Sequence, residues 1–434
     1  MSRLSILTVA AVLTAVPVVT PRVASACGTC MAVGRDLHAA SSFGGLPVPT
    51  PSTDSFLGHP VATGAFSLLV PALNSRPSAP AKLYLDFDGD FVPTWGGFNV
   101  GQTPAFSIDD DASTFSSLEL QKIDEVFQRV AEHFSPFDVN VTTVEPTFFD
   151  TNWSRIVIGG NGSWYPQTVG GLAFVASHQV NFLPRGGWVF SRNLLPGDPQ
   201  HASFVAAAAS HEAGHVFGLE HQSTYGPNGE LLDPYNRGDE FKAPLMGSSY
   251  RKRGLWWNGP NEISASTIQD DLAVLTSGAN RFGYRPDDHA DLPSAATPML
   301  NITPDTVFGA GVIERMSDVD YFSFETLAGT VTFNLLPAPY GPMLDASLAL
   351  YDAAGSLLEM VNTASLGETL TQRLDGGAYR LAVLSRGFYG DIGQYSLTGT
   401  IIPVPEPASV VGLLFAGGII LRRRHRPAWV QILR

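Results

Sequence analysis

Apolar residues in the first half of the chain follow two different periods. Between Ser116 and Phe134 they recur at helical spacing, and Ser116-Ser117-Leu118-Glu119 has the form of a capping box that begins a helix. The predicted buried face of this helix consists of Leu118, Ile123, Val126, Phe127, Val130 and Phe134. Segments rich in β-forming residues lie on either side of it, at 83–87, 139–144, 155–158 and 170–175. This mixture predicts an α+β domain with a mixed sheet over residues 81–284.

A second helix is predicted in the same domain. Asp198-Pro199 can begin it, and the run from Phe204 to Ala209 consists mostly of strong helix formers. This helix leads directly into His211.

The pattern changes at about residue 285. Short alternating segments at 321–324, 331–335, 346–351 and 379–383 are separated by turns of Gly, Pro and Asp. Such spacing is typical of an all-β sandwich, which we expect over residues 285–401. No catalytic cluster is evident in this part of the sequence.

Both ends of the chain have the pattern of processing signals. Residues 1–26 combine a basic Arg3 with an apolar run and small residues, which predicts a secretory signal peptide removed by signal peptidase. Residues 27–80 are rich in Pro, Ser, Gly and Ala, and we interpret them as a linker or pro-segment. Near the C-terminus, an apolar stretch from Val410 to Leu421 precedes a group of arginines, which predicts a transient membrane association. The body of the protein is therefore expected to be exported.

Composition and charge narrow the picture further. A length of 434 residues suggests two domains plus the processing segments. The formal charge of −14 argues against a nucleic-acid partner, although solubility alone would also explain it. The only cysteines are Cys27 and Cys30, so no disulfide framework holds the fold. They can form a local disulfide, remain free thiols, or supply a thiolate that fills a metal site in a latent form.

The strongest chemical signal is the sequence from His211 to His221, which reads H-E-x-x-H-x-x-G-x-x-H. His211 and His215 are four residues apart, so they project from one face of a helix. Gly218 is predicted to end this helix in the left-handed conformation and to let the chain bring His221 to the same centre. Three imidazoles leave a fourth position open, which favours a catalytic zinc ion over a structural one. Glu212 is the predicted general base for the attacking water.

The string resembles the signature of the metzincin clan of zinc endopeptidases, and in particular its secreted bacterial, matrixin-like members. The clan has a methionine-containing turn beneath the metal, and Met246 fits that role. Leu83–Gly89 and Arg129–Val139 resemble the first strand and the end of the first helix in these proteins. The resemblance covers residues 82–284. It implies a metzincin catalytic fold with an active-site helix and zinc-dependent hydrolysis of protein or peptide substrates.

Two details of the resemblance stay open. Some metzincins place a zinc-approaching tyrosine two residues after the methionine, where this chain has Ser248. Tyr250 therefore approaches the metal through a differently shaped turn or is a packing residue. The segment at 170–175 resembles the strand that pairs with substrate in the family, and it can equally be an ordinary strand of the sheet.

Two further resemblances concern the second half of the chain. Four segments resemble the bacterial pre-peptidase C-terminal domain, a module that accompanies secreted peptidases: Asp318–Phe322, Leu348–Gly355, Gly377–Tyr379 and Gly393–Leu397. Residues 402–434 resemble the PEP-CTERM sorting signal, through Val404–Ser409, the apolar stretch and Arg422–Arg426. The latter implies a bacterial extracellular or cell-surface protein processed by an exosortase. A plain C-terminal anchor and a lipoprotein acylated at Cys27 are the alternatives.

Two acidic clusters have the composition of calcium ligands. Asp109-Asp110-Asp111 is one, and Asp86, Asp88 and Asp90 form the other. A solvated loop is the simpler interpretation of both.

The prediction is therefore a secreted or surface-sorted zinc endopeptidase. The alternative is a cell-surface adhesion or matrix protein in which the β sandwich is the working part and the zinc site is not catalytic. Glu212 argues against this alternative, because a purely structural zinc site has no need of a general base.

Overall fold

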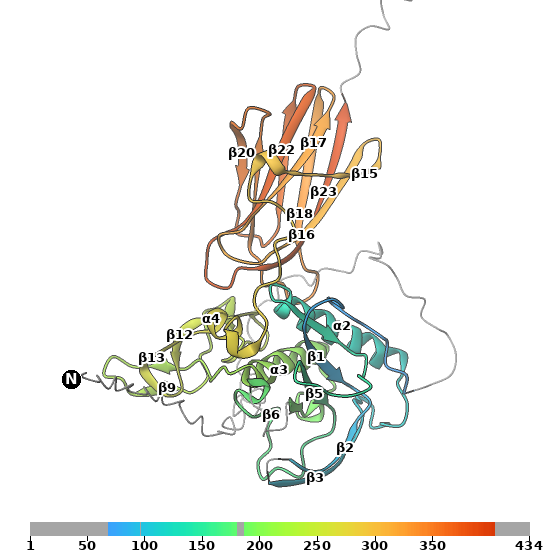
Figure 1. Cartoon of the computed structure of the whole chain (residues 1–434), viewed down its shortest axis with the longest axis vertical. Coiled ribbons are helices and arrows are strands. Elements are labelled where there is room, and N and C mark those ends of the chain that lie inside the picture. Colours follow the sequence, from blue (N-terminus) through green and yellow to red (C-terminus); the bar gives the residue numbers. More distant parts are fainter. Residues whose placement is uncertain (1–67, 96, 180–185, 404–434) are drawn as a thin grey trace, which may run out of the picture.

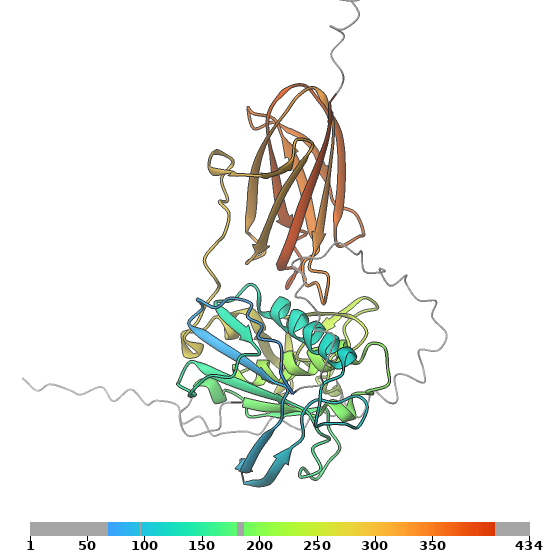
Figure 2. The same cartoon turned by 90° about the vertical axis from the view of Figure 1, so that its right-hand side faces the viewer.

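The computed structural model describes residues 68–95, 97–179 and 186–403. The molecule has two parts (Figures 1 and 2). The N-terminal part contains both long helices, and one extended segment joins it to a C-terminal β sandwich. The expected signal peptide, the cysteine pair and the C-terminal sorting segment lie outside the described residues. Among the residues that are described, none of the helices has the length and hydropathy of a membrane span.

The N-terminal part is built on a five-stranded mixed sheet. Its strand order is β4-β1-β5-β7-β6, and every neighbouring pair is parallel except β6 with β7. The strands are β1 (Ala81–Asp86), β4 (Val139–Thr142), β5 (Trp153–Ile158), β6 (Gly171–Ala173) and β7 (Gly186–Val189). These confirm the four predicted β segments. Helix α2 (Ser117–Phe134) packs against β4 and against helix α3 (His201–Val216), which contacts β5, β6 and β7.

The start of α2 is as the sequence predicts, with one exception on its buried face. The Ser116 side chain accepts from the backbone N–H of Glu119, and the Glu119 side chain accepts from that of Ser116, which completes the capping box. Of the predicted apolar face, Leu118 is 54% exposed, so that assignment is wrong. Glu119 takes the inward position in the first turn because its carboxylate also accepts from the backbone N–H of Ile108 (2.9 Å).

The second helix begins slightly later than predicted. Asp198-Pro199 lies in a turn before it, where Asp198 accepts from the N–H of Gln200 (2.8 Å) and pairs with Arg251 (2.7 Å). Helix α3 then runs from His201, and all its alanines except Ala207 are almost fully buried.

The folded part of the chain extends N-terminally beyond residue 81. Asn74 forms a bridge with Thr142 at the outer side of β4, and Arg76 pairs with Asp138 (2.9 Å). Leu73 exchanges backbone and side-chain hydrogen bonds with Thr143. The segment before β1 therefore acts as a short extra edge of the sheet.

Short two-stranded elements surround the main sheet. One hairpin follows β1, three pairs follow α3, and a short helix precedes the sandwich. They are β2 (Asp90–Trp95) with β3 (Phe98–Thr103), β8 (Thr224–Tyr225) with β9 (Leu231–Asp233), β10 (Lys242–Pro244) with β11 (Arg253–Leu255), β12 (Asn258–Asn261) with β13 (Ser264–Asp270), and helix α4 (Asp271–Leu275).

The C-terminal part is a β sandwich of two five-stranded sheets, as the alternating pattern predicts. One sheet has the order β14-β17-β22-β19-β20 and the other the order β15-β16-β23-β18-β21. The strands are β14 (Thr297–Pro298), β15 (Leu300–Thr303), β16 (Thr306–Ile313), β17 (Val319–Thr326), β18 (Gly329–Pro337), β19 (Ala346–Tyr351), β20 (Leu357–Val361), β21 (Glu368–Leu374), β22 (Gly377–Ser385) and β23 (Gly393–Pro403). Apolar residues at alternate positions, such as Phe333 and Leu381, fill the space between the sheets.

The sandwich contacts the N-terminal part through a buried carboxylate. Glu132 of α2 is fully buried and accepts from the backbone N–H groups of Met343 and Gln394 (both 3.2 Å) and from the Gln394 side chain (3.0 Å). Arg253 of β11 pairs with Asp391 of the sandwich (2.9 Å). Because both carboxylates are fully buried, these contacts belong to a packed interface.

Candidate metal centre

Helix α3 places two of the three histidines. His211 and His215 lie one turn apart on the same side, and their Nε2 atoms are 3.1 Å from each other. Both side chains are buried, at 4% and 1% exposure. The sequence prediction of a shared helical face is therefore correct in geometry.

The third histidine reaches this pair because the helix ends where the sequence predicts. Gly218 has a φ of +103°, and a Cβ atom there would lie 2.7 Å from Nε2 of Gln179. Beyond this turn, the Nε2 atom of His221 lies 3.1 Å from that of His215. All three ligand-type nitrogens lie within 4.8 Å of one another.

Buried amides hold the loop that carries His221. Gln269 accepts from the N–H of Glu220 (3.0 Å) and donates to its carbonyl oxygen (2.9 Å). The N–H of Gln222 donates to the carbonyl oxygen of Met246 (2.8 Å). His221 is thus flanked on both sides by backbone groups that are fixed to other elements.

Each histidine is oriented through its other ring nitrogen. Nδ1 of His211 contacts the carbonyl oxygen of Leu245 (2.8 Å), and Nδ1 of His215 contacts that of Leu219 (2.7 Å). Nδ1 of His221 contacts a carboxylate oxygen of Glu262 (2.7 Å). Carbonyl oxygens only accept hydrogen bonds, and an ionised carboxylate does the same, so each Nδ1 carries a proton and donates it.

This proton arrangement suits the triad to a metal ion. Burial lowers the pKa of His211 to about 3 and that of His221 to about 4, and it holds the pKa of His215 well below its usual range. The rings are therefore neutral, and three Nε2 lone pairs face one another with no proton between them. Tetrahedral zinc with bonds of 2.0–2.1 Å would place ligand nitrogens about 3.3 Å apart. The observed separations of 3.1 Å fit that spacing.

Met246, the methionine expected beneath the metal, packs against α3 at Gly214, between the two helical histidines. It is completely buried under α3, and a Cβ atom at Gly214 would lie only 2.4 Å from its sulfur. Position 214, between the two helical histidines, therefore has to be glycine for the helix to lie this close to the methionine.

Glu212 follows His211 in α3, and its side chain lies against β6, the last strand of the main sheet. It is 2% exposed, and its Oε1 atom would be 2.3 Å from a Cβ atom at Gly171 of β6. The absence of a side chain at Gly171 thus leaves the room that the carboxylate occupies. Gly171 belongs to the segment expected either to pair with substrate or to be an ordinary strand of the sheet, and it sets the position of the Glu212 carboxylate.

Tyr250 and Tyr235 occupy different positions relative to the histidine triad. Tyr250 packs edge-on against Phe204 of α3, with ring centroids 5.8 Å apart, which favours the packing interpretation. Tyr235 instead lies against the triad, with its ring centroid 4.6 Å from that of His221. The sequence analysis missed both Tyr235 and Glu262. Both residues lie outside the histidine motif and meet His221 only through the fold, so no local sequence pattern could have identified them.

The two acidic clusters from the sequence analysis have protein partners in the structure. Arg155 pairs with both Asp86 and Asp90, Arg192 pairs with Asp110, and Asp111 accepts from Ser113. Neither cluster is among the converging metal-ligand groups of the described residues. Their contacts favour the structural interpretation.

Comparisons with known proteins add little to this geometry. No family model matches the chain, and no curated protein matches it. Two solved structures are similar to part of it. The pre-peptidase C-terminal domain of a collagenase from Bacillus anthracis is 15% identical, and the match covers 26% of this chain and all of that one, with a TM-score of 0.21. PliG, a periplasmic inhibitor of g-type lysozyme from Aeromonas hydrophila, is 13% identical, and the match covers 25% of this chain and 96% of that one, with a TM-score of 0.19.

Proposed function

We propose that this protein is an exported zinc-dependent endopeptidase in which Glu212 is the general base. The observation that carries the proposal is the proton arrangement of the triad. Three buried imidazoles have their Nδ1 protons committed to acceptors, and their Nε2 lone pairs converge. A glutamate adjacent in sequence to one of them lies next to the same site.

His211, His215 and His221 would hold the zinc ion through Nε2. When bound, the ion polarises a peptide carbonyl and lowers the pKa of a water molecule. Glu212 takes a proton from the attacking water and later delivers it to the leaving amine. Glu262 keeps the His221 ring in the tautomer that ligates.

Strand β6 is the last strand of the main sheet, and an extended peptide alongside it would pass Gly171 and Glu212. This would bring a scissile carbonyl close to the triad without a large rearrangement. We infer the location from the sequence: the signal peptide and the C-terminal sorting pattern support export to the cell surface or the medium, through signal peptidase and an exosortase.

The proposal is tested with the purified protein and unfolded casein. Internal cleavage, identified by mass spectrometry of the products, is expected to stop with 1,10-phenanthroline and to return when zinc is restored. A surface adhesion protein with a non-catalytic site would bind zinc and yield no products under any of these conditions. That result would reject the endopeptidase proposal.

A further inference from the structure

The loop between β22 and β23 carries a tyrosine that contacts the N-terminal part at the start of helix α4. The hydroxyl of Tyr389 accepts a hydrogen bond from the backbone N–H of Leu272 (3.0 Å) and donates one to the side chain of Asp270. Asp270 is the N-cap of α4, where its carboxylate also accepts from the backbone N–H of Ala273 (2.8 Å). The N–H groups in the first turn of a helix have no partner within the helix, so other groups have to supply one. The sandwich thus completes the cap of a helix that belongs to the other part of the molecule.

Neighbouring residues of the same loop fix Tyr389 in place. Gly390 has a φ of +84°, and a Cβ atom there would lie 2.4 Å from the carbonyl oxygen of Trp256. Asp391 is fully buried and pairs with Arg253 (2.9 Å). The loop therefore packs directly on the backbone of the N-terminal part, with the tyrosine hydroxyl held against α4.

The residue after the N-cap is a completely buried carboxylate. Oδ1 of Asp271 accepts from the side-chain amides of Gln222 and Gln269 (both 2.9 Å), and Oδ2 accepts from the backbone N–H of Trp257 (2.8 Å). The N–H of Asp271 in turn donates to the carbonyl oxygen of Trp257 (2.9 Å). Neutral donors therefore satisfy both carboxylate oxygens, and the place of this carboxylate determines where the two glutamine side chains lie.

These two glutamines fix the backbone on both sides of His221. Gln222 follows the histidine directly, and Gln269 holds the preceding Glu220 by accepting from its N–H and donating to its carbonyl oxygen. The side chain of Gln222 also donates to the carbonyl oxygen of Gln269 (3.1 Å). A displacement of Asp271 would therefore loosen both neighbours of the third histidine at once.

We propose that Asp271 is a positioning residue for His221, and that Tyr389 of the sandwich holds Asp271 in place. The inference rests on the proposed zinc site and extends its support to a residue of the β sandwich. Each step of the path is a hydrogen bond or a neighbour in the chain, from Tyr389 to the first turn of α4, from Asp271 to two amides, and from these to the backbone around His221. His211 and His215 take their positions from α3, so loss of the path should affect chiefly the third ligand.

The consequence is a coupling between the docked sandwich and the metal. If contact of the Tyr389 loop with α4 tightens zinc binding, bound zinc stabilises that contact by the same factor. The sandwich then helps to retain the metal without binding any ligand of its own.

The test measures the zinc affinity of the whole protein by competition with a chromophoric chelator. Tyr389→Phe removes only the hydroxyl and is expected to weaken zinc binding about threefold to tenfold, and Asp271→Asn about tenfold or more, because residues that support metal ligands contribute 10- to 100-fold to affinity. Tyr379→Phe is the matched control, since its hydroxyl donates to the carbonyl oxygen of Asp375 (3.0 Å) within the sandwich. It should bind zinc as the parent protein does.

Two further readouts separate positioning from a general loss of stability. A double variant with Tyr389→Phe and Asp271→Asn should lose no more zinc affinity than Asp271→Asn alone, because the tyrosine acts through the aspartate. With cobalt in place of zinc, the visible absorption bands of Asp271→Asn should shift, since these bands report the geometry of the ligands. A purely structural role would lower the thermal stability and change neither readout.

Unchanged zinc affinity in either single variant, additive losses in the double variant, or unchanged cobalt bands would overturn the proposal. Tyr389→Phe decides the matter even where Asp271→Asn fails to fold. None of these measurements needs catalysis. A parent protein that binds zinc and cleaves no casein would reject the endopeptidase proposal alone, whereas casein cleavage by the parent with unchanged zinc affinity in Tyr389→Phe would reject the positioning proposal alone.

Discussion

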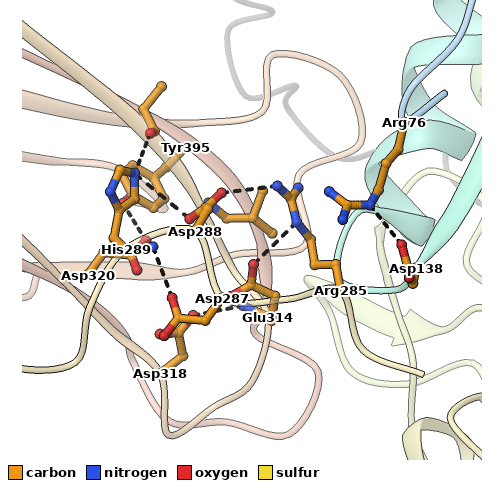
Figure 3. A network of polar contacts seen from close by, with 12 residues as sticks. Arg76, Asp138, Arg285, Asp287, Asp288, His289, Glu314, Asp318, Asp320 and Tyr395 are labelled. Atoms are coloured by element: carbon orange, nitrogen blue, oxygen red, sulfur yellow. Dashed lines mark hydrogen bonds and ion pairs between the residues drawn. The ribbon is translucent and has the colours of Figure 1, made fainter. Parts of the chain in front are cut away.

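Two groups of titratable side chains differ in how the protein compensates their burial. One is the histidine triad, and the other is the linker cluster, the carboxylates at the entry to the sandwich (Figure 3): Asp287, Asp288, Asp291, Glu314, Asp318 and Asp320. In the triad, every Nδ1 has an acceptor, so the rings are neutral and correctly oriented before any ion arrives. In the linker cluster, several carboxylates face one another, and Oδ1 of buried Asp320 lacks a donor. Hydrogen bonds within the protein orient the first group, whereas the second leaves one buried carboxylate oxygen without a donor among the described residues. Removal of zinc should therefore cost the triad its proposed chemistry and leave the orientation of its rings in place.

The largest effect is expected from removing a ligand of the triad. His221→Ala should lower zinc affinity by more than about a hundredfold, which exceeds the loss expected from removing a supporting residue. Competition with a zinc-sensitive dye measures this affinity. Full zinc occupancy in His221→Ala would show that this side chain is not a ligand.

The position of the general base is tested by Gly171→Ala. A Cβ atom there would overlap Glu212, at 2.3 Å from Oε1, so the carboxylate must move. We expect kcat to fall by about a hundredfold while the bound zinc stays at one per chain. Gly197→Ala is a suitable control, because no atom lies within 4 Å of the added Cβ position. Equal kcat values for the two variants would remove Gly171 from the account.

The preorganisation of the triad is tested at Glu262. Glu262→Ala removes the acceptor of the His221 Nδ1 proton and should weaken zinc binding by about 10- to 100-fold. Glu262→Gln keeps an acceptor oxygen and should lose less. If both variants bound zinc as tightly as the parent protein, the orientation of His221 would not depend on this contact.

The smallest effect is expected from Glu132, a buried carboxylate that needs no cation. Burial raises its pKa from 4.5 to about 7, against the opposing effect of its hydrogen bonds from Gln394, Met343 and Ser135. The folded state then holds a proton that the unfolded state has lost, so stability should decrease as the pH rises from about 4.5 to 7. Glu132→Gln should flatten this dependence in thermal unfolding. An unchanged slope in this variant would assign the pH dependence to another group.

The sequence predicts the triad well because its determinants are local. Helical periodicity fixes His211 relative to His215, and the backbone freedom of Gly218 accounts for the return to His221. Alternation likewise predicts the sandwich, because strand burial has a period of two. Glu262 could not be predicted, since its contact with His221 depends on how the segment before β13 folds back across 41 residues.

The linker cluster was missed for the same physical reason. Asp318 and Asp320 were noted only for a family resemblance, and the calcium candidates considered from sequence were runs of neighbouring aspartates. Those runs have arginine and hydroxyl partners in the structure. Side chains that come from distant segments are recognised as one group only when the fold brings them together.

The central claim is that Glu212 acts on water beside an ion held by three histidines. The most direct test measures zinc content and casein cleavage on the same preparations of the parent protein, Glu212→Gln and the exposed-surface control Glu240→Gln. All three should contain one zinc per chain, and only Glu212→Gln should lose cleavage, by roughly a hundredfold or more. Undiminished cleavage by Glu212→Gln, or parent protein that cleaves casein with no zinc bound, would contradict the account.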